Sequence, residues 1–384
     1  MSEWKKVRLG EVAELIAGYA FKSKCFGDYN SKVIKITDIN NEGFFCAALP
    51  GVDISQLDKK KLDKYLVKRG DYVLAMTGSI GKIGKLLDGM AYINQRVLTV
   101  KAFENTDRKY LYFCLKGKPF LEYMLTHIDS HSVQANISAS TIGDFELTLP
   151  PLPTQRKIAA VLGALDDKIE NNRKICANLE AQAQAIFKNS DRRSDAVPFT
   201  ALIKILSGGT PKTSEPSYWG GDIPFFSPKD VGEPYAIYTE RTITKDGLDS
   251  CNSGFYPKDT TFVTARGTVG KVCLAGVPMA MNQSCFALAS DSIDPLLVYS
   301  YTKASIDSLK SKANGSVFDA ITIAEFETER IARLKESEER EFVNIVRPMF
   351  DKILSLSFES RSLAAMRDAL LPKLMSGEID VELR

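Results

Sequence analysis

The sequence predicts an α+β protein made of two similar halves, each a β-rich globular domain followed by a long helix. Two observations support this prediction: an internal repeat runs through the chain, and each copy of the repeat ends in a sustained heptad pattern. The expected boundaries are residues 1–150 and 196–330 for the two globular domains, with helical segments at 151–195 and 331–384.

Composition places the chain among ordinary soluble proteins. Its 384 residues are 44% hydrophobic, which leaves room for several domains, each with its own core. No apolar run reaches the ~18 residues that a membrane span needs, and the polar start "MSEWKKVRLG" is unlike a secretory signal. We therefore expect a cytoplasmic protein. Seven cysteines without a C-x-x-C pair suggest reduced thiols, and two histidines give no basis for a metal site.

The repeat is defined by short motifs at nearly constant spacing. The Gly-Lys segments "GSIGKIG" and "GTVGKV" place Gly81 and Gly270 189 residues apart, and the Asn-Gln pairs that follow them, at Asn94 and Asn282, are 188 apart. Near the ends of the copies, "LDDKIENN" matches "FDKILSL" at a spacing of 184. Small insertions in loops explain why the spacing decreases from 189 to 184 along the repeat. Two copies are too few for a solenoid, so we predict a tandem duplication with pseudo-two-fold symmetry.

The Gly-Lys segments are predicted to be turns between strands and not nucleotide-binding loops. A Walker loop needs four residues between its first glycine and the Gly-Lys-Ser/Thr triplet, and its hydroxyl holds magnesium. Here only two residues separate Gly78 from Gly81, and Ile83 stands where the hydroxyl belongs. Lys82 and Lys271 remain candidates for contact with a phosphate.

The first ~140 residues of each copy are rich in short β-like runs and turn residues, with some helix near 107–126 and 295–312. After the breaker "LPPLPTQ", apolar residues recur in alternating steps of four and three. The helix seam that this pattern predicts includes Ile158, Leu162, Leu165, Ile169 and Leu179 in the first copy, and Phe342, Val346, Ile353, Leu356 and Leu363 in the second. Such a narrow stripe is typical of a coiled coil.

A helix over 155–189 would be about 52 Å long, and the simplest way to bury two matching seams is to pack them on each other. Because a globular domain separates the helices in sequence, we expect them to be antiparallel, with 158–186 facing 342–370. Thr154 is the expected cap of the first helix and Gly377 the stop of the second, and Pro348 should kink the second helix or delay its start. Asn172 either fixes the register or lies near solvent.

Charge alone does not indicate a nucleic-acid partner. Residues 1–150 contain 21 Lys/Arg against 17 Asp/Glu, a net charge of +4, whereas residues 196–330 contain 12 against 15, a net charge of −3. Two divergent domains held apart by a stiff spacer are nevertheless suited to a DNA target read in two separate, unequal pieces.

The whole chain resembles the specificity subunits of type I restriction–modification systems. "LPPLPTQRKIAAVLGALDDKIENNRKICANLEAQAQAIFKNS" is similar to the family's central conserved region, and "SRSLAAMRDALLPKLMSGEIDV" to its C-terminal one. "LSGGTPKTSEPSYWGGDIPFFSPKDV" resembles the start of a target-recognition domain. The resemblance implies two target-recognition domains on a helical spacer, and a non-catalytic subunit that directs its complex to a bipartite, asymmetric target in double-stranded DNA. It also implies two methyltransferase subunits and two restriction-translocation subunits as partners, which would bind the adenosylmethionine and ATP, so that this chain needs no cofactor.

Two other classes of function fit the sequence less well, and one related function remains an alternative. A DNA methyltransferase needs an F-x-G-x-G loop and an Asn/Asp-Pro-Pro-aromatic motif, whereas the one Pro-Pro here, Pro150-Pro151, lies between leucines. No catalytic residue is therefore expected. A coiled-coil adaptor would not need two elaborate β-rich domains. A specificity subunit of a methyltransferase-only or type IIG-like system remains the alternative.

Candidate DNA-contacting residues follow from the chemistry of bases and phosphates. Arginine and lysine suit guanine and phosphate, and amide side chains suit adenine. The candidates in the first domain are Lys22, Lys24, Lys82, Arg96, Ser132 and Gln134; those in the second are Lys212, Tyr218, Lys229, Arg266 and Lys271.

Overall fold

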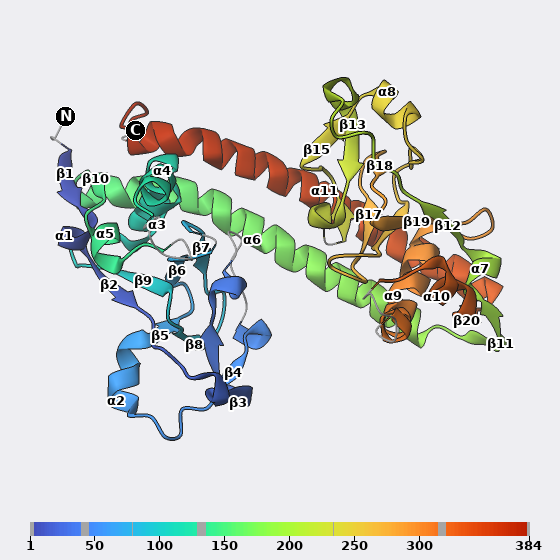
Figure 1. Ribbon diagram of the computed structural model, residues 1–384, viewed down its shortest axis with the longest axis horizontal. Helices are drawn as coiled ribbons and strands as arrows, with labels where there is room; N and C mark the ends of the chain where they lie inside the picture. Colours follow the sequence, from blue (N-terminus) through green and yellow to red (C-terminus); the bar gives the residue numbers. More distant parts are fainter. Residues whose placement is uncertain are drawn as a thin grey trace. The chain divides into compact units, whose positions relative to one another are not determined.

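A computed structural model describes residues 4–39, 46–78, 80–128, 136–232, 234–313 and 320–381 (Figure 1). The chain forms two compact units: unit 1 is Met1–Asp167 with Ala364–Arg384, and unit 2 is Lys168–Leu363. Two long helices, α6 (Leu152–Asn189) and α11 (Glu336–Met375), contribute to both units. Among the described residues, no helix is both long and apolar enough to cross a membrane.

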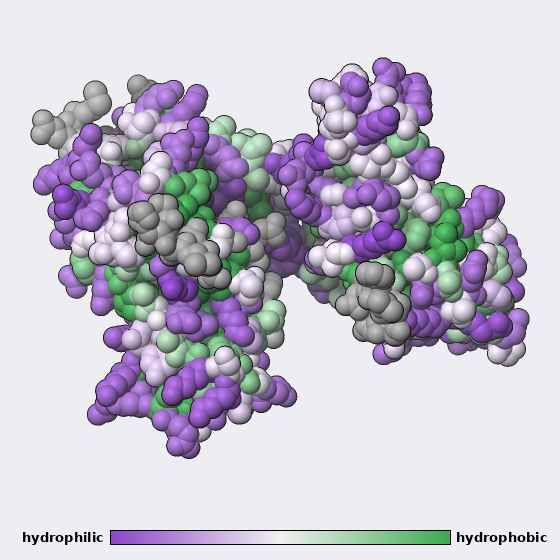
Figure 2. All heavy atoms as spheres, viewed as in Figure 1, coloured by the Kyte–Doolittle hydropathy of each residue, from purple (hydrophilic) through white to green (hydrophobic). Residues whose placement is uncertain are grey.

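Unit 1 contains two four-stranded sheets. The first has the order β2–β9–β6–β7, formed by Ala13–Ala17, Val97–Ala102, Tyr72–Ala75 and Ile83–Lys85. The second has the order β4–β3–β8–β5, formed by Gly51–Val52, Phe26–Ile34, Met90–Ile93 and Leu66–Lys68. A further antiparallel pair joins β1 (Lys5–Arg8) to β10 (Glu146–Leu149). The helices are α1 (Leu9–Val12), α2 (Lys59–Leu62), α3 (Arg108–Lys116), α4 (Lys118–Thr126) and α5 (Ala139–Gly143). Hydrophilic side chains cover the region around α2 (Figure 2).

Unit 2 is built on the same plan. One sheet has the order β12–β19–β16–β17–β14, formed by Lys204–Ser207, Cys285–Ala289, Thr261–Thr264, Val272–Ala275 and Tyr235–Ala236. The other has the order β15–β13–β18, formed by Arg241–Ile243, Trp219–Phe226 and Ala280–Met281, and β11 (Arg192–Pro198) pairs with β20 (Arg330–Leu334). The helices are α7 (Phe199–Leu202), α8 (Lys245–Asp249), α9 (Pro295–Ala313) and α10 (Ile323–Thr328).

The strand order confirms the predicted tandem repeat. The order β2–β9–β6–β7 in unit 1 corresponds in sequence to β12–β19–β16–β17 in unit 2, where β14 is an extra edge strand. In the other sheet of each unit, β3 pairs in parallel with β8, with Val33 opposite Tyr92, and β13 pairs in parallel with β18, with Phe225 opposite Ala280. Parallel pairing of segments so far apart is non-local, so its recurrence reflects duplication of a whole domain.

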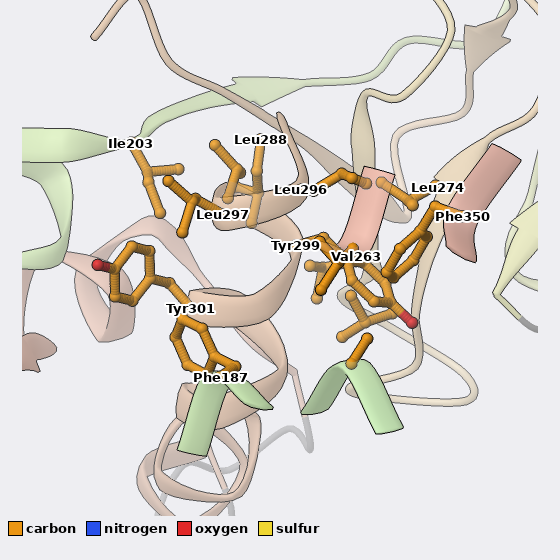
Figure 3. Close-up of a cluster of buried hydrophobic side chains, with 14 of the residues drawn as sticks. Phe187, Ile203, Val263, Leu274, Leu288, Leu296, Leu297, Tyr299, Tyr301 and Phe350 are labelled. Atoms are coloured by element: carbon orange, nitrogen blue, oxygen red, sulfur yellow. The ribbon is translucent and has the colours of Figure 1, made fainter. Parts of the chain in front are cut away.

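The long helices form part of the core of each unit. In unit 2, the Phe187 ring of α6 lies 5.1 Å from the Tyr301 ring and 5.5 Å from the Phe342 ring, and Phe350 of α11 lies 5.6 Å from Tyr299 (Figure 3). In unit 1, the buried side chains of α3, Ile158 and Leu162 of α6, and Leu371 and Leu374 of α11 belong to one cluster. The helices therefore bury apolar surface against the sheet-bearing domains as well as against each other.

Within each unit, α6 and α11 are antiparallel, as predicted. In unit 1, the Arg367 guanidinium donates to the Asp166 carboxylate over 2.5 Å. In unit 2, Asn172 Nδ2 lies 3.3 Å from Ser360 Oγ, and Cys176 Sγ lies 3.8 Å from the Ile353 carbonyl. As the residue numbers rise along α6, the residues that they contact on α11 have falling numbers, which is the pattern of antiparallel helices. Burial disfavours the charge of Arg367, but its hydrogen bonds to Asp166 and Asp368 outweigh this effect and raise its pKa.

The predicted seam residues differ in burial. Six are buried, namely Ile158, Leu162, Phe342, Val346, Ile353 and Leu356, while Leu165, Ile169, Leu179 and Leu363 are half-buried.

All seven cysteines are free, and burial raises the pKa of both Cys114 and Cys273 to about 12.

The structure bears on three predictions about the helix ends. Helix α11 begins at Glu336, so Pro348 does not delay its start, and the kink, the other expected effect, stays a prediction; the proline is exposed, where water can satisfy the carbonyl that loses its amide partner. Thr154 lies inside the first turn of α6, which begins at Leu152, and is not its cap. Gly377 has φ +75° just beyond the end of α11 and its amide donates to the Leu374 carbonyl, which is the expected stop.

Candidate nucleic-acid interface

The Gly-Lys segment is the turn between two neighbouring antiparallel strands in each unit, as predicted. It joins β6 to β7 in unit 1 and β16 to β17 in unit 2. Gly78 and Gly81 have φ +66° and +79°, and Gly267 and Gly270 have φ +82° and +77°. Glycine is favoured at these positions because a Cβ atom is strained in the left-handed region. Lys82 and Lys271 are exposed at the end of this turn.

The Asn-Gln turn lies directly beside the Gly-Lys turn. In unit 1 the Met76 amide donates to the Arg96 carbonyl over 2.9 Å, and in unit 2 the Ala265 amide donates to the Ser284 carbonyl over 2.8 Å. These bonds join equivalent positions of the repeat. Side chains of both turns therefore emerge on the same edge of each unit.

A third segment meets the Asn-Gln turn through a close backbone contact. A Cβ atom at Gly18 would lie 2.1 Å from the Asn94 carbonyl oxygen, and one at Gly208 would lie 2.0 Å from that of Asn282. Real Cβ atoms do not approach so closely, so only glycine fits at either position. The segments that follow these glycines contain the candidates Lys22 and Lys24 in unit 1 and Lys212 in unit 2.

A fourth segment joins the other side of the Gly-Lys turn. The Ile137 amide donates to the Met76 carbonyl over 3.2 Å, and the Ile321 amide donates to the Ala265 carbonyl over 3.0 Å. The candidates Ser132 and Gln134 belong to the stretch just before Ile137, and they lie outside the described residues. We call these joined segments of each unit its contact edge: 18–24, 76–78, 80–82, 94–96 and 136–137 in unit 1, and 208–212, 264–271, 282–284 and 320–321 in unit 2.

In unit 1, the structure places four predicted residues on this edge. Lys22 immediately precedes a short 3-10 turn (Ser23–Cys25) and Lys24 lies within it, Lys82 ends the Gly-Lys turn, and Arg96 is part of the Asn-Gln turn. All four side chains are exposed, and none has an ion pair or hydrogen bond within the described part of the chain. Cations without a partner on one edge are available to a polyanion.

In unit 2, three predicted residues lie on the contact edge and two do not. Arg266 and Lys271 are exposed on the Gly-Lys turn, and Lys212 lies two residues beyond Thr210, whose hydroxyl donates to Gln283 of the Asn-Gln turn. Lys229 instead lies 3.9 Å from Glu240 in an exposed ion pair. Tyr218 is half-buried, and its carbonyl accepts the Thr244 amide at the start of α8.

Sequence reasoning missed Lys310, a residue of α9. A Cβ atom at Gly270 would lie 2.1 Å from Cε of Lys310, so the lysine's aliphatic stem crosses the Gly-Lys turn. Leu121 occupies the equivalent place above Gly81 in unit 1. Lys310 thus adds a third cation near Arg266 and Lys271, within a domain of net negative charge. No sequence signal could have revealed this contact, because it joins a helix to a turn 40 residues away.

Comparison with protein families matches most of the chain. The family model described as type I restriction modification DNA specificity domain matches residues 1–181 and 198–349, one copy in each half. The MjaIX specificity subunit of a type I restriction enzyme from Methanocaldococcus jannaschii is 22% identical over 409 aligned positions, covering 99% of this chain and 94% of the relative. The HindI specificity subunit from Haemophilus influenzae is 23% identical over 469 positions, covering 99% of this chain and all of the relative.

A solved structure shows the same fold. The S subunit of a type I restriction–modification system from M. genitalium aligns with a TM-score of 0.52 at 16% identity, covering 97% of this chain and 96% of that one. The similarity therefore extends through both repeats and both long helices.

Proposed function

Because this chain belongs to the type I restriction modification DNA specificity family, it is a DNA sequence-specificity subunit, and we propose that its two halves read the two parts of one bipartite, asymmetric DNA target. Unit 1 would read one half-site and unit 2 the other. The chain would direct its complex to the target without catalysing a reaction itself.

One observation supports the bipartite reading above all. The two contact edges share the same backbone hydrogen bonds but present different side chains, since Arg96 in unit 1 is replaced by Ser284 in unit 2. The residue packed against the Gly-Lys turn also differs: Leu121 in unit 1 is replaced by Lys310 in unit 2. A shared scaffold with different exposed groups suits the recognition of two different short sequences, because phosphate contacts position a protein while base-edge contacts specify the sequence.

The expected partners follow from the family. We propose a cytoplasmic complex with two methyltransferase subunits, which would bind adenosylmethionine, and two restriction-translocation subunits, which would bind ATP. The exposed cations of each edge would share phosphate neutralisation with these partners, since the net charge of +2 of the whole chain is small.

Methylome sequencing tests this function directly. The chain is expressed with the methyltransferase subunit of its own system in a host that lacks other adenine methylation. We expect methyladenine at one motif composed of two specific parts separated by unspecified bases. Methylation at a continuous motif, or methylation that persists when this chain is omitted, would contradict the proposal.

A gel shift measures DNA binding in the same complex. Binding to a fragment that contains the motif should weaken as salt rises, because the cations release counterions from the DNA. Purified chain alone, incubated with labelled adenosylmethionine, should retain no label; retained label would support a catalytic role instead.

A further inference from the structure

Arg96 has an unusual backbone for its residue type. Its φ is +72°, and it is exposed. Only one other described residue that is not glycine, Asp259, shares this left-handed region. Arginine is not among the residues that adopt this conformation easily, and outliers of this kind persist where the surroundings or a function require them.

The turn around Arg96 carries a second cost. In unit 2, Oδ1 of Asn282 accepts the Ser284 amide over 3.0 Å, which is a relaxed turn. In unit 1, Oδ1 of the equivalent Asn94 is buried and has no hydrogen-bond partner among the described residues. Compared with the turn of unit 2, the left-handed turn of unit 1 therefore lacks the hydrogen bond to the asparagine Oδ1. What differs in return is the placement of the Arg96 side chain.

Unit 2 has its own exposed arginine at the same junction, but on the neighbouring turn. Arg266 follows Ala265, and the amides of both residues lie within 3.3 Å of the Ser284 carbonyl. At the spacing of 189 that relates the Gly-Lys turns, Arg266 corresponds to Thr77; at the spacing of 188 that relates the Asn-Gln pairs, Arg96 corresponds to Ser284. Each unit thus places one arginine at the hydrogen-bonded junction of its Gly-Lys and Asn-Gln turns, from opposite sides.

Neither the Arg96 guanidinium nor the Arg266 guanidinium stabilises the fold through a contact within the described part of the chain. Within the described part of the chain, the side chains of Arg96 and Arg266 make no hydrogen bond, ion pair or stacking contact. Other exposed arginines do, such as Arg8, which lies 3.4 Å from Asp144. Lys82 and Lys271 stand on the same Gly-Lys turns and would meet phosphate as point charges, whereas the planar guanidinium can donate two parallel hydrogen bonds.

We propose that Arg96 and Arg266 each donate paired hydrogen bonds to O6 and N7 of one guanine, Arg96 in the half-site of unit 1 and Arg266 in that of unit 2. Paired donation to these atoms in the major groove is the commonest specific contact between protein and DNA. Since this assignment rests on the function proposed above, each half of the target should contain a G·C pair read by one arginine.

The decisive variants are Arg96→Lys and Arg266→Lys, compared by methylome sequencing of the chain expressed with its methyltransferase subunit. Lysine keeps the positive charge but lacks the planar guanidinium that donates two parallel hydrogen bonds. Arg96→Lys should relax one G·C position in one half of the motif, with discrimination reduced on the order of 10- to 100-fold, and leave the other half unchanged. Arg266→Lys should relax one position in the other half only. Arg8→Lys, the same substitution at an exposed arginine of unit 1 outside the contact edge, should leave the motif intact.

Arg96→Gly separates recognition from folding. Glycine adopts φ +72° without strain, so this variant should melt at or above the wild-type temperature while its motif relaxes at the same position. The assignment would be overturned if both lysine variants kept the wild-type motif, or if a half-site contained no G·C pair. In either case a two-part motif of the wild-type chain would still support the general function. A wild-type chain that directs no two-part methylation would overturn both.

Discussion

At the scale of single residues, Asn172 shows how one polar side chain interrupts an apolar helix interface. It is fully buried, and its Nδ2 donates to Glu359 over 2.8 Å and to Ser360 over 3.3 Å. A position near solvent, one of two readings of the sequence, is therefore wrong. A shift of one helix along the other would leave this amide without its partners, so Asn172 favours a single register.

Asn172→Asp should destabilise the protein severely, because it places a carboxylate of nearly the same shape against Glu359. We expect a loss of about 3 kcal/mol in the free energy of unfolding at neutral pH, measured by chemical denaturation. The new carboxyl should have a raised pKa in the folded state, so part of the loss should be recovered as the pH falls toward ~4. Its neighbour Asn171 is exposed, and Asn171→Asp should change the free energy by less than about 0.5 kcal/mol. Equal effects of the two substitutions would show that position 172 is accessible to water.

Gly208→Ala tests the close backbone contact at the contact edge of unit 2. The added Cβ would lie 2.0 Å from the Asn282 carbonyl oxygen, and neither backbone can yield without moving the Asn-Gln turn. We expect a loss of about 2 kcal/mol or more, together with weaker methylation. At Gly10 a Cβ would lie 3.5 Å from the nearest atom, so Gly10→Ala is the matched control that should fold normally. Normal stability and methylation in Gly208→Ala would mean that this contact does not shape the edge.

At the scale of elements, the long helices show what local sequence patterns can and cannot predict. The heptad steps predicted that both helices exist and pack on each other, because a repeated apolar stripe is a local signal. Their antiparallel direction followed from the globular domain that separates them in sequence. The unequal burial of Ile353 and Leu165 was not predictable, since it depends on where the sheet-bearing domains meet the helices. The delayed start expected from Pro348 was wrong for a related reason: the cost of a proline in a helix depends on whether water reaches the affected carbonyl.

Substitutions along α11 should separate buried from exposed apolar positions. Ile353 is fully buried, whereas Ile345 is 41% exposed on the same helix. Ile353→Asp should cost about 3 kcal/mol or more, because it buries an unpaired charge, and Ile345→Asp should cost less than about 1 kcal/mol. Thermal melting of the two variants side by side measures the difference. Similar melting temperatures would mean that α11 does not pack in unit 2 as described.

At the scale of the whole molecule, the duplication was readable from the sequence but the contact edges were not. Gly81, Gly270 and the two Asn-Gln pairs repeat at nearly constant spacing, so the two halves could be aligned directly. The pairing of β3 with β8 and the crossing of Lys310 over Gly270 join segments remote in sequence, which no periodicity reports. Ser132 and Gln134 remain predictions, as do the DNA contacts of the residues on both edges.

The central claim is that the two halves read DNA independently. Replacing residues 1–150 with the corresponding domain of a family member that has a different target, followed by methylome sequencing of the complex, tests it most directly. Each contact edge is formed within its own unit, so one half of the methylated motif should change to that of the donor while the other half stays as it was. A motif that changes in both halves, or in neither, would contradict the claim.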